Sequence, residues 1–212
     1  MTLLQTAPSE TMLEAGGYAK GVAVAIVTQN KDDQQLCRVK VRYPWHDKPR
    51  ESYWARLATP MAGDGRGLVL IPEIGDEVLV GFEREDLRFP FVLGALWNGK
   101  EKPPLANTDG KNDRRKLVSR KKHYLLFDDG DKGVVELSHH NGSRVRFTDE
   151  EIVLQDKQGN QLSITTASGA MKIQSSGQLD IKAAVVNIEA TGTLSLKAGA
   201  TLTVRGALVN IN

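Results

Sequence analysis

The chain has 212 residues, of which 40% are hydrophobic and 25% charged, and its formal net charge at pH 7 is +2. These values exclude an intrinsically disordered chain and a strongly basic one that seeks polyanions, and the length allows one domain or two small ones. The longest apolar run, residues 22–27, is far too short to span a bilayer.

Residues 1–17 are predicted to be an N-terminal tail. They contain no basic segment followed by a long apolar one, so no signal peptide is predicted. The single cysteine, Cys37, cannot form an intrachain disulfide, and its apolar neighbours Leu36 and Val39 favour a thiol buried in a strand. We therefore expect the chain to be made and folded in a reducing cytoplasm.

Residues 18–99 have the pattern of a small β-barrel. GVAVAIVTQN and LCRVKVRYPW alternate apolar and polar residues on either side of a turn-like NKDDQQ, which predicts a hairpin. Further short strands follow, separated by glycine and proline, and all three tryptophans lie in this part of the chain. Five or six strands in about 80 residues predict a closed barrel with an aromatic-rich core.

Residues 100–123 form a charged, turn-rich stretch, KEKPPLANTDGKNDRRKLVSRKKH. It holds nine basic and three acidic residues, a local charge of +6, which exceeds the net charge of the whole chain. A solvated connector that runs into a first strand is predicted here.

Residues 124–212 contain apolar residues in i, i+2 pairs, which is a strand signature. From Leu162/Ile164 onward the pairs are regular, with successive steps of 9, 8, 7, 8, 8 and 7 residues, and glycines punctuate them. No proline follows Pro104 and no aromatic residue follows Phe147. The paired residues predicted to form the core are Leu162, Ile164, Met171, Ile173, Leu179, Ile181, Val186, Ile188, Leu194, Leu196, Leu202 and Val204.

A period near eight residues is too short for a self-contained unit, so each repeat is read as one strand and a corner stacked on the next. Three identical chains wound around one axis would give every layer three strands and a narrow aliphatic core. At about 4.8 Å per layer the seven repeats would extend roughly 30–35 Å. The sequence thus predicts an all-β protein with a barrel followed by an intertwined trimeric β-helix, a β-prism needle. An ordinary β-sandwich with coincidental spacing is the alternative.

Four stretches of the barrel region carry a resemblance to a known family: RVKVRYPW, YWARLATPMAG, GDEVLVGFE and FPFVLGALWNGKEKPP. They are similar to the OB-fold domain of the central spike proteins of contractile injection systems, namely VgrG proteins and the phage baseplate assembly protein V group. DGKNDRRKLVSRKKHYLLFDD and VVELSHHNGSRVRF resemble the VgrG segment where the barrel passes into the needle. The resemblance as a whole covers about residues 17–212, nearly the whole chain.

The resemblance implies a homotrimeric structural spike that links a baseplate hub to a tip and pierces a target envelope when a sheath contracts. Only about 17 residues precede the barrel, where VgrG proteins carry a hub region, so the hub is expected to be a separate protein. Some phage spikes of this group end in an iron-binding His-x-His apex, but no histidine lies in the last 70 residues here. A PAAR-repeat tip protein is therefore expected to dock on Val209, Asn210, Ile211 and Asn212. The implied location is a phage tail or a tail-like particle.

No catalytic or cofactor motif is found, and no enzyme activity, cofactor or metal is expected. His139 and His140 are read as part of a surface turn, because neighbouring strand residues point to opposite faces and no further ligands accompany them in the sequence. The run 128–131 begins like a calcium loop but lacks the glutamate at the twelfth position. The carboxylates Glu83, Glu85 and Asp86 are assigned to a hairpin tip.

Two other functions stay open at this point. A trimeric fibre or adhesin could bind a receptor or a glycan. An OB-like barrel with Tyr43, Trp45, Tyr53 and Trp54 beside a basic connector also fits the pattern of single-stranded nucleic-acid binding. The acidic residues crowded between Asp64 and Asp86 argue against a nucleic-acid partner.

Overall fold

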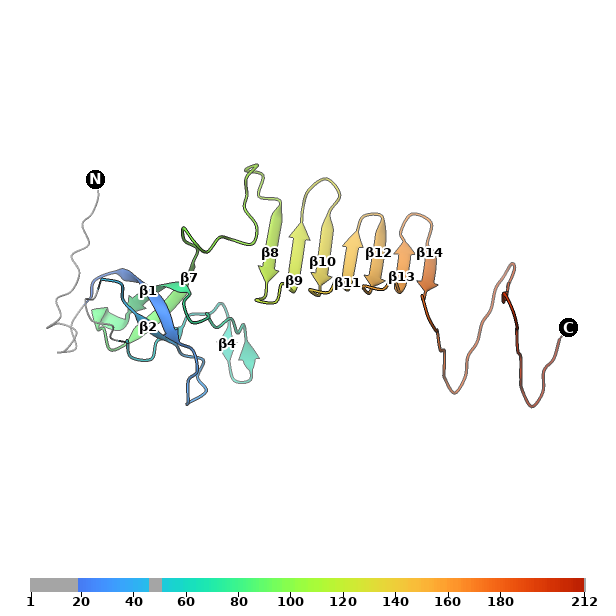
Figure 1. The fold of residues 1–212 in the computed structure, drawn as a ribbon, viewed down its shortest axis with the longest axis horizontal. Coiled ribbons are helices and arrows are strands. Elements are labelled where there is room, and N and C mark those ends of the chain that lie inside the picture. Colours follow the sequence, from blue (N-terminus) through green and yellow to red (C-terminus); the bar gives the residue numbers. More distant parts are fainter. Residues whose placement is uncertain (1–18, 46–50, 212) are drawn as a thin grey trace. The chain divides into compact units, whose positions relative to one another are not determined.

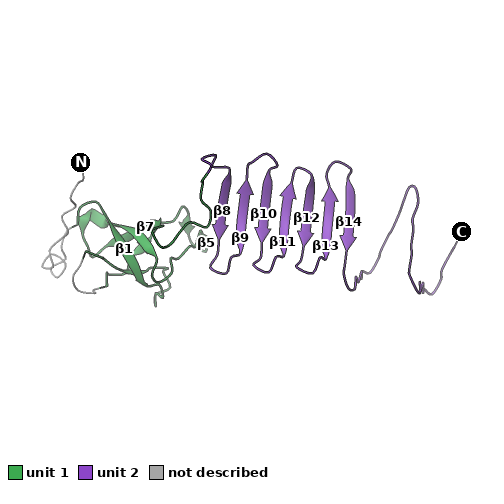
Figure 2. Ribbon diagram, turned by 45° about the horizontal axis from the view of Figure 1, so that its top comes forward, with its two compact units in different colours: residues 1–108 green, residues 109–212 purple. Residues whose placement is uncertain are grey.

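The computed structural model describes residues 19–45 and 51–211. These residues form β-strands and one 3-10 turn, η1 (Glu83–Glu85), with no α-helix, and the described part therefore contains no helix that could cross a membrane. The predicted all-β class is confirmed. The chain divides into two compact units, residues 1–108 and 109–212 (Figure 2). The predicted tail, residues 1–17, lies outside the described residues.

The first unit is built on a five-stranded sheet with a short ribbon. Its strands are β1 (Val22–Gln29), β2 (Lys40–Arg42), β3 (Arg56–Leu57), β4 (Ala62–Gly63), β5 (Arg66–Gly67), β6 (Glu77–Phe82) and β7 (Pro90–Leu96). The sheet order is β2-β1-β6-β7-β3, and β4 pairs with β5. The antiparallel pairing of β1 with β2 confirms the predicted hairpin.

The sheet of the first unit closes on itself. The chain just before β3 returns to the region of β2 through two isolated bridges, Val39 with Ala55 and Arg42 with Glu51. Since β3 also pairs with β7, the sheet has no free edge along this path. The turn η1 connects β6 to β7, as predicted for the carboxylates at positions 83–86. Closure turns one face of every strand inward and creates the core.

Valines dominate this core, so the predicted aromatic-rich core is wrong. Val39, Val41, Val78 and Val80 are fully buried, and Tyr43 is the one aromatic side chain among the buried described residues. The remaining core residues are Ala25, Val27, Ala55 and Val92. Trp45 and Phe82 flank Tyr43, with ring centroids 5.1 Å and 5.9 Å from it. A barrel this small has room inside for small branched side chains rather than for several rings.

Cys37 is exposed and lies outside the strands, so the prediction of a buried strand thiol is also wrong. Its φ is 55°, in the left-handed region, and β2 begins only at Lys40. The preceding loop is organised by Asp32, which interrupts the alternating pattern that the sequence suggested.

The second unit contains one antiparallel ladder. Its strands are β8 (Arg114–Val118), β9 (Tyr124–Asp128), β10 (Val134–Ser138), β11 (Arg144–Thr148), β12 (Glu151–Gln155), β13 (Gln161–Thr165) and β14 (Ala170–Gln174). Each strand pairs with the next along the chain, in the order β8 to β14 (Figure 1). The first strand, β8, lies within the stretch 100–123 that the sequence assigns to the connector. The ladder bonds between residues 114 and 174 are formed within one chain, whereas the sequence analysis placed strands of three chains in every layer.

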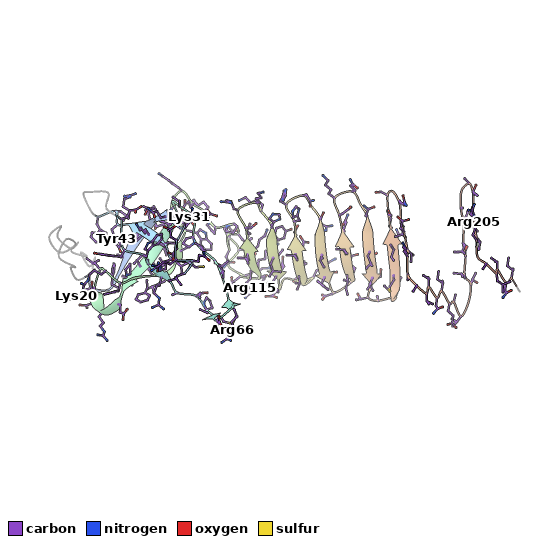
Figure 3. All side chains as sticks on the ribbon, turned by 90° about the horizontal axis from the view of Figure 1, so that it is seen from below. Lys20, Lys31, Tyr43, Arg66, Arg115 and Arg205 are labelled. Carbon is purple, nitrogen blue, oxygen red and sulfur yellow. The ribbon has the colours of Figure 1, made fainter. Side chains whose placement is uncertain are left out.

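Beyond β14 the chain continues without regular strands up to residue 211. In Figure 1 this segment runs on as an extended zigzag. In Figure 3 the side chains around Arg205 project from a backbone that has no neighbouring segment beside it. Every residue from 165 to 211 is exposed.

Candidate functional site: an uncovered apolar face

One face of the ladder carries two unbroken rows of side chains that are almost entirely apolar. Residues directly opposite each other in an antiparallel ladder point to the same side, and so do residues i and i+2 of a strand. The registers therefore assign both rows to the same face. The first row is Leu117, Leu125, Leu137, Val145, Leu154, Leu162 and Ile173. The second row, after Arg115, is Phe127, Val135, Phe147, Ile152, Ile164 and Met171.

The opposite face is polar and is internally bonded. The Tyr124 hydroxyl donates a hydrogen bond to Glu136, whose carboxylate also lies 3.7 Å from the Arg146 guanidinium. Arg114 and Asp128 form a further pair, 2.8 Å from Nε to Oδ2. The carboxylate of Glu136 raises the pKa of Tyr124 chiefly through this hydrogen bond. Several charged groups of this face therefore have partners from neighbouring strands, whereas the buried Nε atoms of Arg144 and Arg146 have no hydrogen-bond partner among the described residues.

The burial of the two faces is the reverse of what a stable sheet requires. Glu136 on the polar face is buried, with 6% of its surface exposed, whereas Leu137 beside it on the apolar face is 59% exposed. The apolar face forms the wall of an open groove of about 670 Å³ that extends from Leu137 to Leu179. Domains bury such a face against a second layer, and the described part of this chain supplies none. A contiguous apolar surface of this extent marks an interaction site.

The twelve predicted core residues fall into two groups. Leu162, Ile164, Met171 and Ile173 lie on the apolar face, where Leu162 pairs with Ile173 and Ile164 with Met171. The other eight lie in the strandless segment after β14, and all of them are more than half exposed; they are Leu179, Ile181, Val186, Ile188, Leu194, Leu196, Leu202 and Val204. In that segment neither their backbone nor their side chains have ladder partners within the described chain.

The four residues predicted to receive a tip protein lie at the end of the same segment. Ile211 is 91% exposed and Val209 is 47% exposed, and Asn210 between them is also exposed. Asn212 lies outside the described residues.

A cluster of three histidines, which the sequence analysis missed, lies at one edge of the ladder. His123 follows the turn between β8 and β9, and His139 and His140 begin the turn between β10 and β11. Alternate turns of an antiparallel ladder lie at the same edge, which brings residues 16 positions apart into contact. Gly142, with φ of 94°, closes the second turn and donates its N–H to the His139 carbonyl at 3.0 Å.

His139 and His140 do not point to opposite faces of a strand, because β10 ends at Ser138 and both residues belong to the turn. Partial burial, then the charges of the other two histidines and of Lys121, hold the pKa of His123 below its usual value. Its ring is therefore neutral at pH 7.

The acidic run 128–131 forms the turn between β9 and β10. Arg114 pairs with Asp128, and Arg115 pairs with Asp129 at 2.6 Å, so two of the carboxylates that resembled a calcium loop have arginine partners. The Gly130 N–H and Arg114 together lower the pKa of Asp128. These contacts account for the run as the turn between β9 and β10, tied to β8 by two ion pairs.

Comparison with known proteins defines the class of the first unit. Residues 23–97 match the family described as the type VI secretion system/phage-baseplate injector OB domain, a match that begins in β1 and ends just after β7. The closed barrel is therefore the part of the chain that is similar to this injector OB domain. The resemblance to VgrG and baseplate-V proteins that the sequence predicted is thereby confirmed.

Three similar proteins, two of them named as spike proteins, are much longer than this chain. VgrG1c, a type VI secretion system spike protein of Pseudomonas aeruginosa, is 34% identical over 93 residues, which cover 40% of this chain and 13% of that protein. VgrG3, a type VI spike protein of Vibrio cholerae, is 31% identical over 99 residues, or 43% and 10% of the two chains. The actin cross-linking toxin VgrG1 of Vibrio cholerae is 30% identical over 92 residues, or 40% and 8%. The matched region is thus about a tenth of each relative's length.

Proposed function

We propose that this protein is a structural spike of a contractile injection system, a homotrimer that joins a baseplate hub to a tip and pierces a target envelope on sheath contraction. The observation that carries the proposal is the uncovered apolar face of the ladder, found in a chain whose barrel is similar to an injector OB domain. Three copies of the ladder arranged with their apolar faces inward form a closed prism with a polar outer surface.

The segment after β14 supports the same assembly. Its apolar residues continue the i, i+2 pattern with a period near eight, yet the described chain offers its backbone no ladder partner. Unpaired backbone groups next to exposed apolar side chains are stabilised when other copies supply strands. In the proposed trimer, each chain forms one wall between residues 114 and 174, and the three chains intertwine beyond that.

Stiffness is the mechanical property that the proposal requires. Bending a closed prism breaks many ladder hydrogen bonds at once and opens its aliphatic core, so the shaft transmits force along its axis. The work of such a protein is mechanical and needs no catalytic turnover. The similar proteins named as spikes support this non-enzymatic role.

The two further partners rest on different grounds. A PAAR-repeat tip protein is proposed for Val209, Asn210, Ile211 and Asn212, and the exposure of Val209 and Ile211 supports an apolar docking platform there. A baseplate hub that would hold the barrels is proposed on the family resemblance alone. The proposed location is a phage tail or tail-like particle, assembled from protein made in the bacterial cytoplasm.

Immunogold electron microscopy tests this function directly. Tail-like particles purified from the producing bacterium are labelled with an antibody raised against this chain. The proposal predicts label at the baseplate end, beneath the tube. Label at the distal ends of lateral fibres would favour an adhesin, and label absent from particles but present on a single-stranded nucleic-acid fraction would favour the nucleic-acid alternative.

A further inference from the structure

The histidine cluster has the composition of a metal site. The ring centroids of His123 and His139 are 4.3 Å apart, those of His139 and His140 are 4.3 Å apart, and those of His123 and His140 are 4.9 Å apart. One ring nitrogen from each of the three lies within 4.8 Å of the others. Three imidazoles from two separate turns thus lie next to one another.

The nitrogen–nitrogen limit of 4.8 Å is wider than the spacing around a bound ion. Zinc–nitrogen bonds of about 2.0–2.1 Å in tetrahedral geometry place ligand nitrogens roughly 3.3–3.4 Å apart. The two turns are exposed, so small side-chain rotations can close the remaining gap. His140 donates its backbone N–H to Nδ1 of His123, and Asn141 donates to Nδ1 of His139, both at 3.3 Å. Because both bonds are long, either ring can give up its Nδ1 to a metal ion or turn over to offer Nε2.

We propose that His123, His139 and His140 bind one divalent transition-metal ion of the zinc class at the edge of the ladder. Imidazole suits zinc, nickel and copper, and three protein ligands leave one position for water. Magnesium and calcium are poor candidates because the cluster offers no oxygen ligand. Lys121 and Lys122 lie in the adjoining turn, and their charges oppose a cation and weaken its binding.

The site has a structural consequence for the ladder. His123 belongs to the β8–β9 hairpin and the other two histidines belong to the β10–β11 hairpin. A bound ion ties the two hairpins together at their turns, at the end of the ladder that follows the connector. Binding to the folded state alone also stabilises that state by mass action. The site does not depend on the trimer, because all three ligands come from one chain.

Titration of the full chain, prepared without a histidine tag, tests the site. Zinc is titrated in competition with a chromophoric chelator, and cobalt is added separately as a spectroscopic probe of tetrahedral coordination. We expect one zinc ion per chain and the intense visible absorption of tetrahedral cobalt. His123→Gln and His139→Gln should each weaken zinc binding at least about tenfold. His46→Gln, which removes a histidine from the first unit, serves as the matched control and should bind zinc as the wild type does.

Two results would overturn the proposal. One is zinc binding of equal strength in the wild type, His123→Gln and His139→Gln, and the other is the absence of both zinc binding and the cobalt spectrum. Circular dichroism of the metal-free variants must match the wild type, and His140→Gln provides an independent third variant if either of the others fails to fold.

Discussion

Asp32 organises the loop that precedes β2. Its hydrogen bonds hold residues 34–38 in a loop, although the alternating sequence there favours a strand. Its Oδ atoms accept hydrogen bonds from the backbone N–H groups of Gln34 at 3.0 Å and Leu36 at 3.2 Å. They also form a two-pronged pair with the Arg38 guanidinium, at 2.8 and 2.9 Å, and the Asp32 side chain is only 3% exposed. Asp side chains that bond nearby backbone groups favour turns over strands. Cys37 is consequently held in the loop and exposed to solvent.

The Asp32 carboxylate predicts a pH dependence of stability. The Arg38 hydrogen bond is the main cause that lowers its pKa in the folded protein below the ordinary 3.8. A lowered pKa means that the stabilisation is fully present above about pH 4 and is lost as the pH falls through the folded-state value. We expect the urea midpoint of Asp32→Asn to lie below that of the wild type at neutral pH, with a gap that narrows below about pH 4. Tryptophan fluorescence is the measurement, since Trp45, Trp54 and Trp97 all lie in the first unit. A gap that stays constant under acid would refute the assignment.

Removal of the Tyr43 hydroxyl is expected to leave the first unit at least as stable as the wild type. Its hydroxyl is buried without a hydrogen-bond partner among the described residues, and burial raises the pKa of this group. Leaving a buried polar group unpaired costs about 1–3 kcal/mol. Tyr43→Phe should therefore leave the free energy of unfolding unchanged or raise it by about 1 kcal/mol, because the ring contacts with Trp45 and Phe82 are kept. Tyr53→Phe, at a 62% exposed position, is the control. A loss of stability in Tyr43→Phe would show that the hydroxyl is paired.

At the scale of elements, the strands between residues 124 and 174 could be predicted from the sequence, but their partners in the ladder could not. The i, i+2 pairs such as Leu125/Phe127 and Leu162/Ile164 occur in β9 and β13, because period-two alternation is a property of each strand alone. Which strand pairs with which depends on turn geometry and on other chains. Turns such as residues 129–133 allow each strand to fold back on its predecessor, so the ladder between residues 114 and 174 forms within one chain.

Neighbouring residues of β13 give a matched test of the apolar face. Leu162 lies on that face, opposite Leu154 and Ile173, whereas Ser163 lies on the polar face opposite Lys172. Leu162→Asp should abolish assembly, because a trimer would bury three like charges in its core without partners. Ser163→Asp introduces the same charge one residue away and should leave assembly intact. Size-exclusion chromatography of the two variants is the measurement. Intact assembly of Leu162→Asp would contradict the orientation of the face.

At the scale of the whole molecule, the chain combines a unit that buries its own core with one that does not. The barrel encloses its valines, and its resemblance to injector OB domains could be recognised from short sequence stretches. The histidine cluster could not be found in this way, since His123 meets His139 only after four strands pair. The sequence signal that could have predicted the cluster is the similar length of successive strands. In an antiparallel ladder, strands of equal length place every second turn at the same edge.

Light scattering of the purified protein tests the central claim that the ladder assembles with other copies. The absolute mass is measured for the full chain and for a version that ends at Asp156. The account predicts a mass about three times 23.2 kDa for the full chain. The shortened version lacks β13, β14 and the paired residues beyond them, so it should lose the trimer or aggregate. A full chain that stays at 23.2 kDa and remains soluble would contradict the account, because its apolar face would then be stable in water without a second layer.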